Sequence, residues 1–179
     1  MRVFIIIIFT AFTTGALAQC PKNPAISEEL DEAYRSLKFA KFPRDAQVAT
    51  DVLWSLWTRA PDNRAQRLLN RGMMNLRLGD LAAAEGFLSV LIKYCPDYAE
   101  GYNQRAFARY LAGNFEGALP DLARALSIQP RHLGALSGKG LTHLALGQPE
   151  LAEIEFRKEM ALNPFTADRD LIPNLGTGL

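Results

Sequence analysis

The chain has 179 residues, of which 49% are hydrophobic and 22% charged, and its formal net charge is +1. This composition suits one folded domain with an apolar core. The near-neutral charge argues against nucleic acid as a partner, because nucleic-acid binders carry a strongly basic surface, and it indicates neither an acidic nor a basic substrate.

The segment from Met1 to Ala18 has the pattern of a secretory signal peptide. Arg2 supplies a positive start, an apolar run covers residues 3–12, and Ala-Leu-Ala ending at Ala18 has the form of a cleavage site. We expect cleavage after Ala18, a periplasmic or secreted protein, and no membrane span after cleavage. An uncleaved span is disfavoured because threonines interrupt the apolar run. A lipid on Cys20 is the other alternative, disfavoured because Gln19 is not small.

The mature chain would hold two cysteines, Cys20 and Cys95. In an oxidising compartment they could form a disulfide that ties the amino terminus to the body of the protein. Two separate thiols are the alternative, and both remain open because the sequence does not place the two Cα atoms. His132 and His143 lack neighbouring cysteines or clustered carboxylates, so we expect no metal site and no cofactor.

Residues 19–64 predict a pair of helices, interpreted as a degenerate copy of the unit that follows. Apolar residues have helical spacing within 33–37 and within 49–57, and a Phe-Pro-Arg turn separates the two segments. Trp54 and Trp57 belong to the second segment. We expect them to pack against the first full unit rather than to hold a ligand, because aromatic side chains dominate protein cores.

From residue 65 onward the chain repeats with a period of about 34 residues. Equivalent positions hold glycine, proline and alanine three times each, at Gly79, Gly113 and Gly147, at Pro96, Pro130 and Pro164, and at Ala84, Ala118 and Ala152. Apolar residues between each glycine and its proline follow the spacing of a helical face. Another helix-like run precedes each glycine, at 68–78, 102–112 and 136–146. Each unit therefore predicts two antiparallel helices, the first ended by glycine and the second by proline.

This unit resembles the tetratricopeptide repeat (TPR), a helix–turn–helix repeat of the same length. In the middle copy the residues that carry the resemblance are Tyr102, Ala106, Gly113, Ala118, Leu122 and Pro130. The resemblance implies an all-α solenoid of antiparallel helix pairs wound into a right-handed superhelix. Its repeats would cover 65–98, 99–132 and 133–166, followed by a tail at 167–179.

Two residues depart from the repeating pattern. Glu159 replaces the alanine or leucine of the earlier copies, as expected for an outer face that no further repeat covers. The tail after it is expected to add a short capping turn. Pro120 lies about one and a half turns inside a predicted helix, so we expect a bent or loosened first turn there, and we find no functional interpretation for it.

Charged residues recur at equivalent positions of the last two repeats, as Arg105 with Asp121 and as Lys139 with Glu155. A pair that recurs with the repeat is most simply a structural salt bridge between the two helices of one unit. No nucleophile with a base stands outside the repeating pattern, so we predict that the protein is not an enzyme.

The resemblance implies that the concave surface, made by the first helix of each repeat, binds a peptide or a partner's helix. The side chains expected there are Tyr98, Asn103, Gln104, Phe107, Arg131, His132 and Ser137. The amides could bond a peptide backbone and the arginine could bind a carboxylate, with the aromatic rings supplying apolar contact. Tyr98 and His132 could instead pack the corner between repeats, and both interpretations stay open.

The carboxylate clamp found in some members of the family can be tested directly on the sequence. It requires lysine, asparagine and arginine on three successive first helices. The corresponding residues here are Leu69, Met73, Gln104, Gly134 and Gly138. The clamp is therefore not expected in this protein.

The chain also resembles secreted bacterial repeat proteins without an assigned role. The leading hypothesis is a periplasmic, non-enzymatic scaffold that binds a protein or peptide and assists assembly of an envelope complex. The alternative is a non-catalytic adaptor or regulatory subunit of an envelope enzyme, such as a cell-wall hydrolase. An enzyme in its own right ranks third, because the sequence shows no convergent titratable groups. The partner's identity and the oligomeric state are not predicted.

Overall fold

The computed structural model describes residues 20–22 and 26–172, which form eight α-helices and one short 3-10 helix, without strands. The elements are α1 (Ser27–Lys38), α2 (Pro43–Trp57), α3 (Asn63–Leu78), α4 (Leu81–Tyr94), α5 (Ala99–Leu111), α6 (Phe115–Ile128), α7 (Leu133–Ala145), α8 (Pro149–Leu162) and η1 (Ala167–Leu171). The predicted all-α fold is confirmed. The predicted signal peptide lies outside the described residues.

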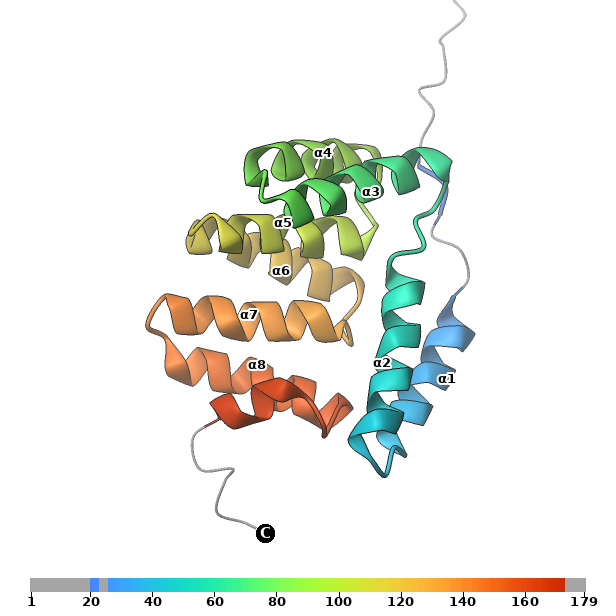
Figure 1. The fold of residues 1–179 in the computed structure, drawn as a ribbon, viewed down its shortest axis with the longest axis vertical. Coiled ribbons are helices and arrows are strands. Elements are labelled where there is room, and N and C mark those ends of the chain that lie inside the picture. Colours follow the sequence, from blue (N-terminus) through green and yellow to red (C-terminus); the bar gives the residue numbers. More distant parts are fainter. Residues whose placement is uncertain (1–19, 23–25, 173–179) are drawn as a thin grey trace, which may run out of the picture.

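Helices α3 to α8 form three antiparallel pairs that stack one on another (Figure 1). The glycine that joins the two helices of each pair has a left-handed conformation, with φ of 76° at Gly79, 75° at Gly113 and 70° at Gly147. Side chains with a Cβ adopt this conformation at a cost, and glycine adopts it freely. The repeating glycines therefore end α3, α5 and α7 as expected.

Small residues let the two helices of a pair approach each other. A methyl group at Gly72 would lie 2.6 Å from the Leu88 side chain, and one at Gly140 would lie 2.3 Å from the Phe156 ring. Leu88 and Phe156 are both fully buried. The sequence repeat therefore places a small residue beneath a large one in each of these pairs.

The first helices begin three to five residues earlier than their apolar runs suggested, at Asn63, Ala99 and Leu133. Polar residues at the helix ends account for part of this difference, because capping does not depend on an apolar stripe. Asp62 accepts a hydrogen bond from the N–H of Ala65 (2.7 Å) at the start of α3.

Helix α6 runs without a break from Phe115 to Ile128, with Pro120 inside it. Its first turn is capped by Asn114, whose Oδ1 accepts from the N–H of Gly117 (3.0 Å). The Gly117 carbonyl in turn accepts from Arg109 (2.9 Å). The helix therefore continues through Pro120, and a side-chain cap and an arginine from α5 hold its first turn in place.

The predicted ion pairs join the two helices of a repeat. Arg105 binds Asp121 through two hydrogen bonds of 2.6 and 2.8 Å, and Lys139 donates to Glu155 over 2.9 Å. The Asp121 bonds raise the pKa of Arg105. Burial raises the pKa of Glu155, but Lys139 and a second lysine outweigh burial and lower it overall.

Helices α1 and α2 form the expected pair but run crosswise to the stack rather than continuing it (Figure 1). Leu133, at the start of α7, lies in the same buried cluster as Leu37 and Leu53. Trp57 stacks on His132 with 4.0 Å between ring centroids. The expectation that the tryptophans pack on the first repeat is wrong, because α2 lies against the amino-terminal ends of α5 and α7.

A disulfide joins Cys20 to Cys95, whose Cα atoms lie 5.1 Å apart. Cys95 is buried at the end of α4, in the core cluster of the first repeat. The bridge therefore ties the segment before α1 to the stack at a point 75 residues away along the chain.

At the end of the stack, Glu159 is buried, although it was expected to face outward. Glu159 is only 5% exposed, because the following segment folds back over α8 as η1. Thr166 donates to Glu159 (2.8 Å), and Ile172 lies in the same buried cluster as Phe156. The expected capping turn is present, and it covers the residue that was expected to face outward.

Candidate functional site

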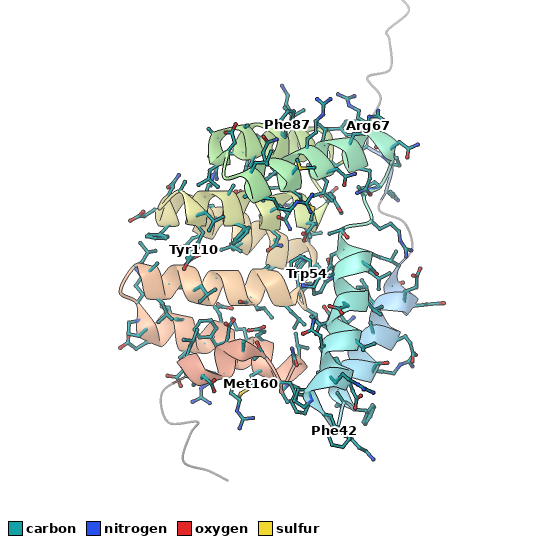
Figure 2. The ribbon with its side chains drawn as sticks, viewed as in Figure 1. Phe42, Trp54, Arg67, Phe87, Tyr110 and Met160 are labelled. Carbon is teal, nitrogen blue, oxygen red and sulfur yellow. A yellow bond between two sulfur atoms is a disulfide. The ribbon has the colours of Figure 1, made fainter. Side chains whose placement is uncertain are left out.

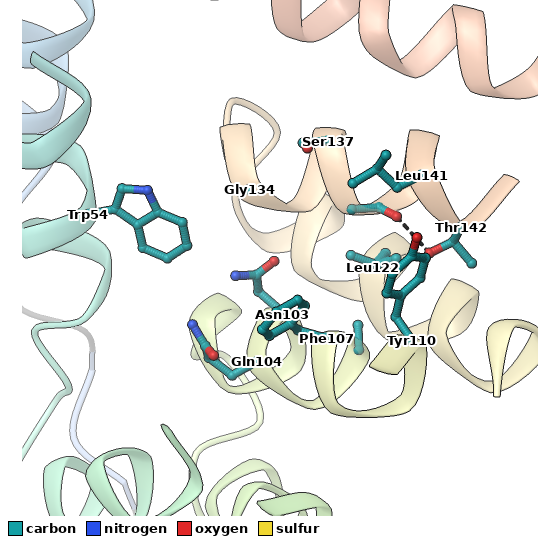
Figure 3. Close-up of a pocket in the computed structure, with 12 residues that line it drawn as sticks. Trp54, Asn103, Gln104, Phe107, Tyr110, Leu122, Gly134, Ser137, Leu141 and Thr142 are labelled. Atoms are coloured by element: carbon teal, nitrogen blue, oxygen red, sulfur yellow. Dashed lines mark hydrogen bonds between the residues drawn. The ribbon is translucent and has the colours of Figure 1, made fainter. Parts of the chain in front are cut away.

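An apolar hollow of about 310 Å³ lies between α5 and α7, beside α2 (Figure 3). Most of its wall is aliphatic or aromatic, and none of its lining residues is charged. The residues that line it are Trp54, Asn103, Gln104, Ala106, Phe107, Tyr110, Leu122, Gly134, Ser137, Gly138, Leu141 and Thr142. We call this site the apolar hollow.

The repeat itself builds the floor of the apolar hollow. Phe107 of α5 and Leu141 of α7 occupy equivalent positions of successive repeats, and Phe107 is 49% exposed. Gly138 of α7 allows α6 to lie close, since a methyl group there would lie 3.2 Å from Leu122. The hollow therefore combines an exposed aromatic ring with room beside it.

Trp54 forms the end wall of the apolar hollow and comes from outside the repeats. Its ring points from α2 toward the stack (Figure 2), and a methyl group at Gly134 would lie 3.3 Å from it. The indole is 36% exposed. Helix α2 thus supplies one aromatic surface to a hollow otherwise made by α5, α6 and α7.

Four of the seven residues predicted for the concave surface line the apolar hollow, namely Asn103, Gln104, Phe107 and Ser137. The two amides are not fully free. Asn103 donates to Glu100 (3.1 Å), and Gln104 donates to the same carboxylate (2.6 Å). Their amide nitrogens are therefore held in place by the protein.

The other three predicted residues hold the helical pair α1–α2 against the stack. The Tyr98 hydroxyl donates to the Trp57 carbonyl (2.7 Å), and burial raises the pKa of that hydroxyl. Arg131 pairs with Asp31 and lies 4.3 Å from the centre of the Tyr34 ring. The interpretation of Tyr98 as a packing residue is therefore the one that holds.

His132 likewise packs inside the protein and is not exposed at all. Its Nδ1 accepts from the N–H of Ala135 (3.3 Å), so Nε2 carries the hydrogen and donates to Glu100 (2.8 Å). One face of the imidazole stacks on Trp57. Tyr98 and His132 occupy the same position in two successive repeats, but each makes a different contact with α2, Tyr98 by a hydrogen bond and His132 by stacking.

Sequence reasoning missed Glu100 and Trp54. Glu100 is 1% exposed and joins two amides and a histidine. The amides at i+3 and i+4 were a local signal for a bonded carboxylate. The contribution of His132 had no local signal, because it is 32 residues away. The position of Trp54 likewise depends on how α2 crosses the stack.

The described part of the chain contains no group of three or more histidine, cysteine or acidic side chains that could hold a metal ion. Within the same residues, every helix is too short or too polar to span a membrane. The chemistry of the apolar hollow is that of binding by apolar contact and a few hydrogen bonds.

Comparison with known proteins finds similar sequences in bacteria and animals. The chain is 28% identical to a TPR repeat-containing protein of Rhizobium etli over 142 residues, which cover 79% of this chain and 69% of the relative. It is 31% identical to tetratricopeptide repeat protein 36 of Bos taurus over 121 residues, which cover 65% of this chain and 64% of the relative. No protein-family model matches the chain.

Solved structures share the fold. The TPR domain of Arabidopsis OM64 matches 60% of this chain and 88% of its own length, with a TM-score of 0.58 and 21% identity. The first TPR domain of RPAP3, bound to the HSP90 peptide SRMEEVD, matches 60% and 85%, with a TM-score of 0.59 and 20% identity. MamA matches 86% and 82%, with a TM-score of 0.52 and 19% identity.

Proposed function

Because the chain belongs to the tetratricopeptide-repeat family, we propose that it is a non-enzymatic scaffold that binds a segment of a partner protein in the apolar hollow. The observation that carries the proposal is Phe107, a ring left 49% exposed beside a space of about 310 Å³. An apolar side chain of a partner would bury this ring and Leu141 together. Burial of that kind is the main favourable contribution to protein association.

The absence of charged side chains from the lining of the apolar hollow indicates which kind of partner segment it can bind. Its lining residues include no lysine, arginine, aspartate or glutamate. In the RPAP3 structure the bound peptide, SRMEEVD, has three acidic residues among its last four. Here Gly134 and Gly138 occupy positions that a carboxylate clamp would fill with cationic side chains. We therefore propose an apolar anchor rather than an acidic carboxyl terminus as the bound feature.

We also propose that the protein works outside the cytoplasm, in the periplasm or beyond it, and assists the assembly of an envelope complex. Two features support this location. The segment from Met1 to Ala18 has the pattern of a signal peptide, and a disulfide joins Cys20 to Cys95, a bond that persists in oxidising compartments. A fusion of residues 1–25 to a reporter that is active only after export tests the location, and an inactive reporter would contradict it.

Photo-crosslinking in living cells tests the binding proposal. A photoreactive phenylalanine analogue replaces Phe107 in one strain and Val90 of α4 in a matched strain, because both residues are 49% exposed. We expect one defined adduct from position 107 and none of the same mass from position 90. Substitution of Leu141 by aspartate should abolish the adduct at 107. If the two positions give the same adducts, or position 107 gives none, the apolar hollow is not the binding surface.

A further inference from the structure

A second hollow lies on the other side of Trp54. Its volume is also about 310 Å³, and it lies between α2, α7, α8 and the segment that leads into η1. Polar side chains contribute much of its wall, namely Gln47, Thr50, Ser137, Glu159, Asn163 and Thr166. We call it the polar hollow. Trp54, Gly134 and Ser137 line both hollows, so the indole separates two adjoining spaces.

Among the residues that line the polar hollow, only Glu159 has an ionisable acidic side chain. It is 5% exposed, one carboxylate oxygen accepts from Thr166, and the carboxyl group also shares a hydrogen bond with Asp168. The bond to Asp168 raises the pKa of Glu159, so the two carboxyl groups share one proton and together keep one negative charge. Glu159 lines the polar hollow and Asp168 adjoins it from outside the lining, and none of the lining residues is lysine or arginine.

Burial of such a carboxylate is unfavourable unless a positive charge or a donor faces it. Burial raises the pKa of Glu159 from 4.5 to about 8, the bond from Thr166 opposes this increase, and Asp168 adds to it. The protein on its own therefore leaves this pair without a cation. The buried carboxylates of Asp121 and Glu100, in contrast, receive hydrogen bonds on both oxygens, Asp121 from arginine and Glu100 from amides and a histidine.

We propose that the polar hollow receives a lysine or arginine side chain of the partner segment whose apolar side chain occupies the apolar hollow. This inference rests on the proposed binding function and adds the chemistry of the segment. The cation would face Glu159 and replace the proton that it shares with Asp168. The cationic side chain would also pass Trp54, whose ring face attracts cations. The recognised feature is then an apolar residue with a basic residue a short distance along the chain.

Synthetic peptides test this proposal on the full chain. The probes are short end-blocked glycine–serine peptides that carry one phenylalanine and one lysine at a series of separations. Matched peptides replace the lysine by norleucine, and others replace the phenylalanine by alanine. We expect at least one separation at which the lysine peptide binds more tightly than its norleucine counterpart by about tenfold.

A double substitution assigns the preference to the carboxylates. Glu159→Gln with Asp168→Asn removes both ionisable groups while keeping size and hydrogen-bonding groups. The control is Glu150→Gln with Asp170→Asn, which makes the same changes at exposed positions of α8 and η1. We expect the lysine preference to vanish in the first variant and to persist in the second, with both variants retaining the helical circular dichroism of the native protein.

The outcomes separate this inference from the function on which it rests. If lysine and norleucine peptides bind equally well while loss of phenylalanine weakens binding, the polar hollow does not select a cation, and the apolar hollow still binds peptides. A lysine preference that survives the Glu159 and Asp168 double variant also overturns the inference. If loss of phenylalanine has no effect at all, the proposed function falls and this inference falls with it.

Discussion

The three stacked helix pairs and the pair α1–α2 have similar helices but are held in different ways. Within the stack, the contacts recur from one sequence repeat to the next, with a left-handed glycine between the helices and a small residue beneath a large one. The pair α1–α2 is held by contacts that occur once, such as Trp57 on His132 and the disulfide at Cys95.

This difference shows where the site comes from. A stack of equivalent repeats would present the same concave surface along its length. Here α2 closes one end of that surface and adds Trp54, which divides it into an apolar and a polar hollow. The unrepeated contacts therefore decide which part of the repeated surface stays accessible and which side chains line it.

The largest effect is expected from Phe156→Ala, which acts on the repeated packing. Phe156 is fully buried against Gly140, and we expect its truncation to lower the free energy of unfolding by about 4 kcal/mol. Urea denaturation followed by circular dichroism measures this loss. The control Ile154→Ala alters a residue of the same helix that is 49% exposed, and an equal loss in both would show that this core does not hold the stack.

The next effect tests the unrepeated contact at His132. His132→Ala removes the donor to Glu100 and the ring that stacks on Trp57, and we expect a loss of about 3 kcal/mol. Hydrogen exchange should accelerate in α1 and α2 much more than in α8. Uniform acceleration through all the helices would mean that the pair and the stack unfold as one unit.

Removal of the disulfide should have a somewhat smaller effect. Cys20→Ala leaves Cys95 as a buried thiol and releases a loop whose ends are 75 residues apart, so we expect a loss of about 2–3 kcal/mol. Thermal unfolding of the variant, beside the wild type with and without reductant, measures it. A wild-type protein that is insensitive to reductant while the variant is destabilised would point to a role of the Cys20 side chain other than the bridge.

Glu159 predicts a dependence of stability on pH that is opposite to that of most acidic residues. Its folded pKa of about 8 lies above the ordinary 4.5, so the folded protein holds a proton that the unfolded chain releases. Stability from this residue is fully present below about pH 4.5 and is lost as pH rises toward about 8. We expect wild type to lose about 2 kcal/mol relative to Glu159→Gln between about pH 5 and pH 7.

Chemical denaturation of the wild type and the Glu159→Gln variant across this range measures the difference directly. Subtracting the two curves removes the contribution of other carboxyl groups. Among these is Glu155, whose pKa is lowered by its lysine partners against the effect of burial, and which therefore loses its contribution as pH falls. A difference that stays constant with pH would show that Glu159 is ionised in the folded protein throughout.

The smallest effect is expected at the junction between α2 and the stack. Asp62 caps α3 by accepting from Ala65 and also accepts from the Tyr94 hydroxyl (2.6 Å). We expect Asp62→Ala to cost about 1 kcal/mol, and Asp62→Asn, which keeps a capping oxygen, to cost much less. Thermal unfolding of the two variants compares them, and equal losses would assign the effect to charge rather than to capping.

The features of the stack could be predicted from the sequence much better than those of the pair α1–α2. The turn glycines, the helix pairing and the ion pairs Arg105–Asp121 and Lys139–Glu155 were readable because each has an equivalent in a neighbouring repeat. The site was only half readable. Asn103, Gln104, Phe107 and Ser137 line the apolar hollow, whereas Tyr98, Arg131 and His132 face the helices of the amino-terminal pair.

The wrong expectations share a cause, since each concerns an element placed by contacts without a local pattern. Trp54 and Trp57 lie against α5 and α7 because residues much further along the chain, such as Tyr98 and His132, receive them. Glu159 is buried because the chain after α8 turns back over it.

The order of the amino acids was enough to identify helices, their pairing and their stacking, since those depend on spacing along a few turns and on a repeat that every copy reinforces. The path of α2 across the stack, the two hollows beside Trp54 and the burial of Glu159 emerged with the three-dimensional structure. They depend on single contacts between distant residues, and such contacts leave no periodic trace because nothing in the chain repeats them.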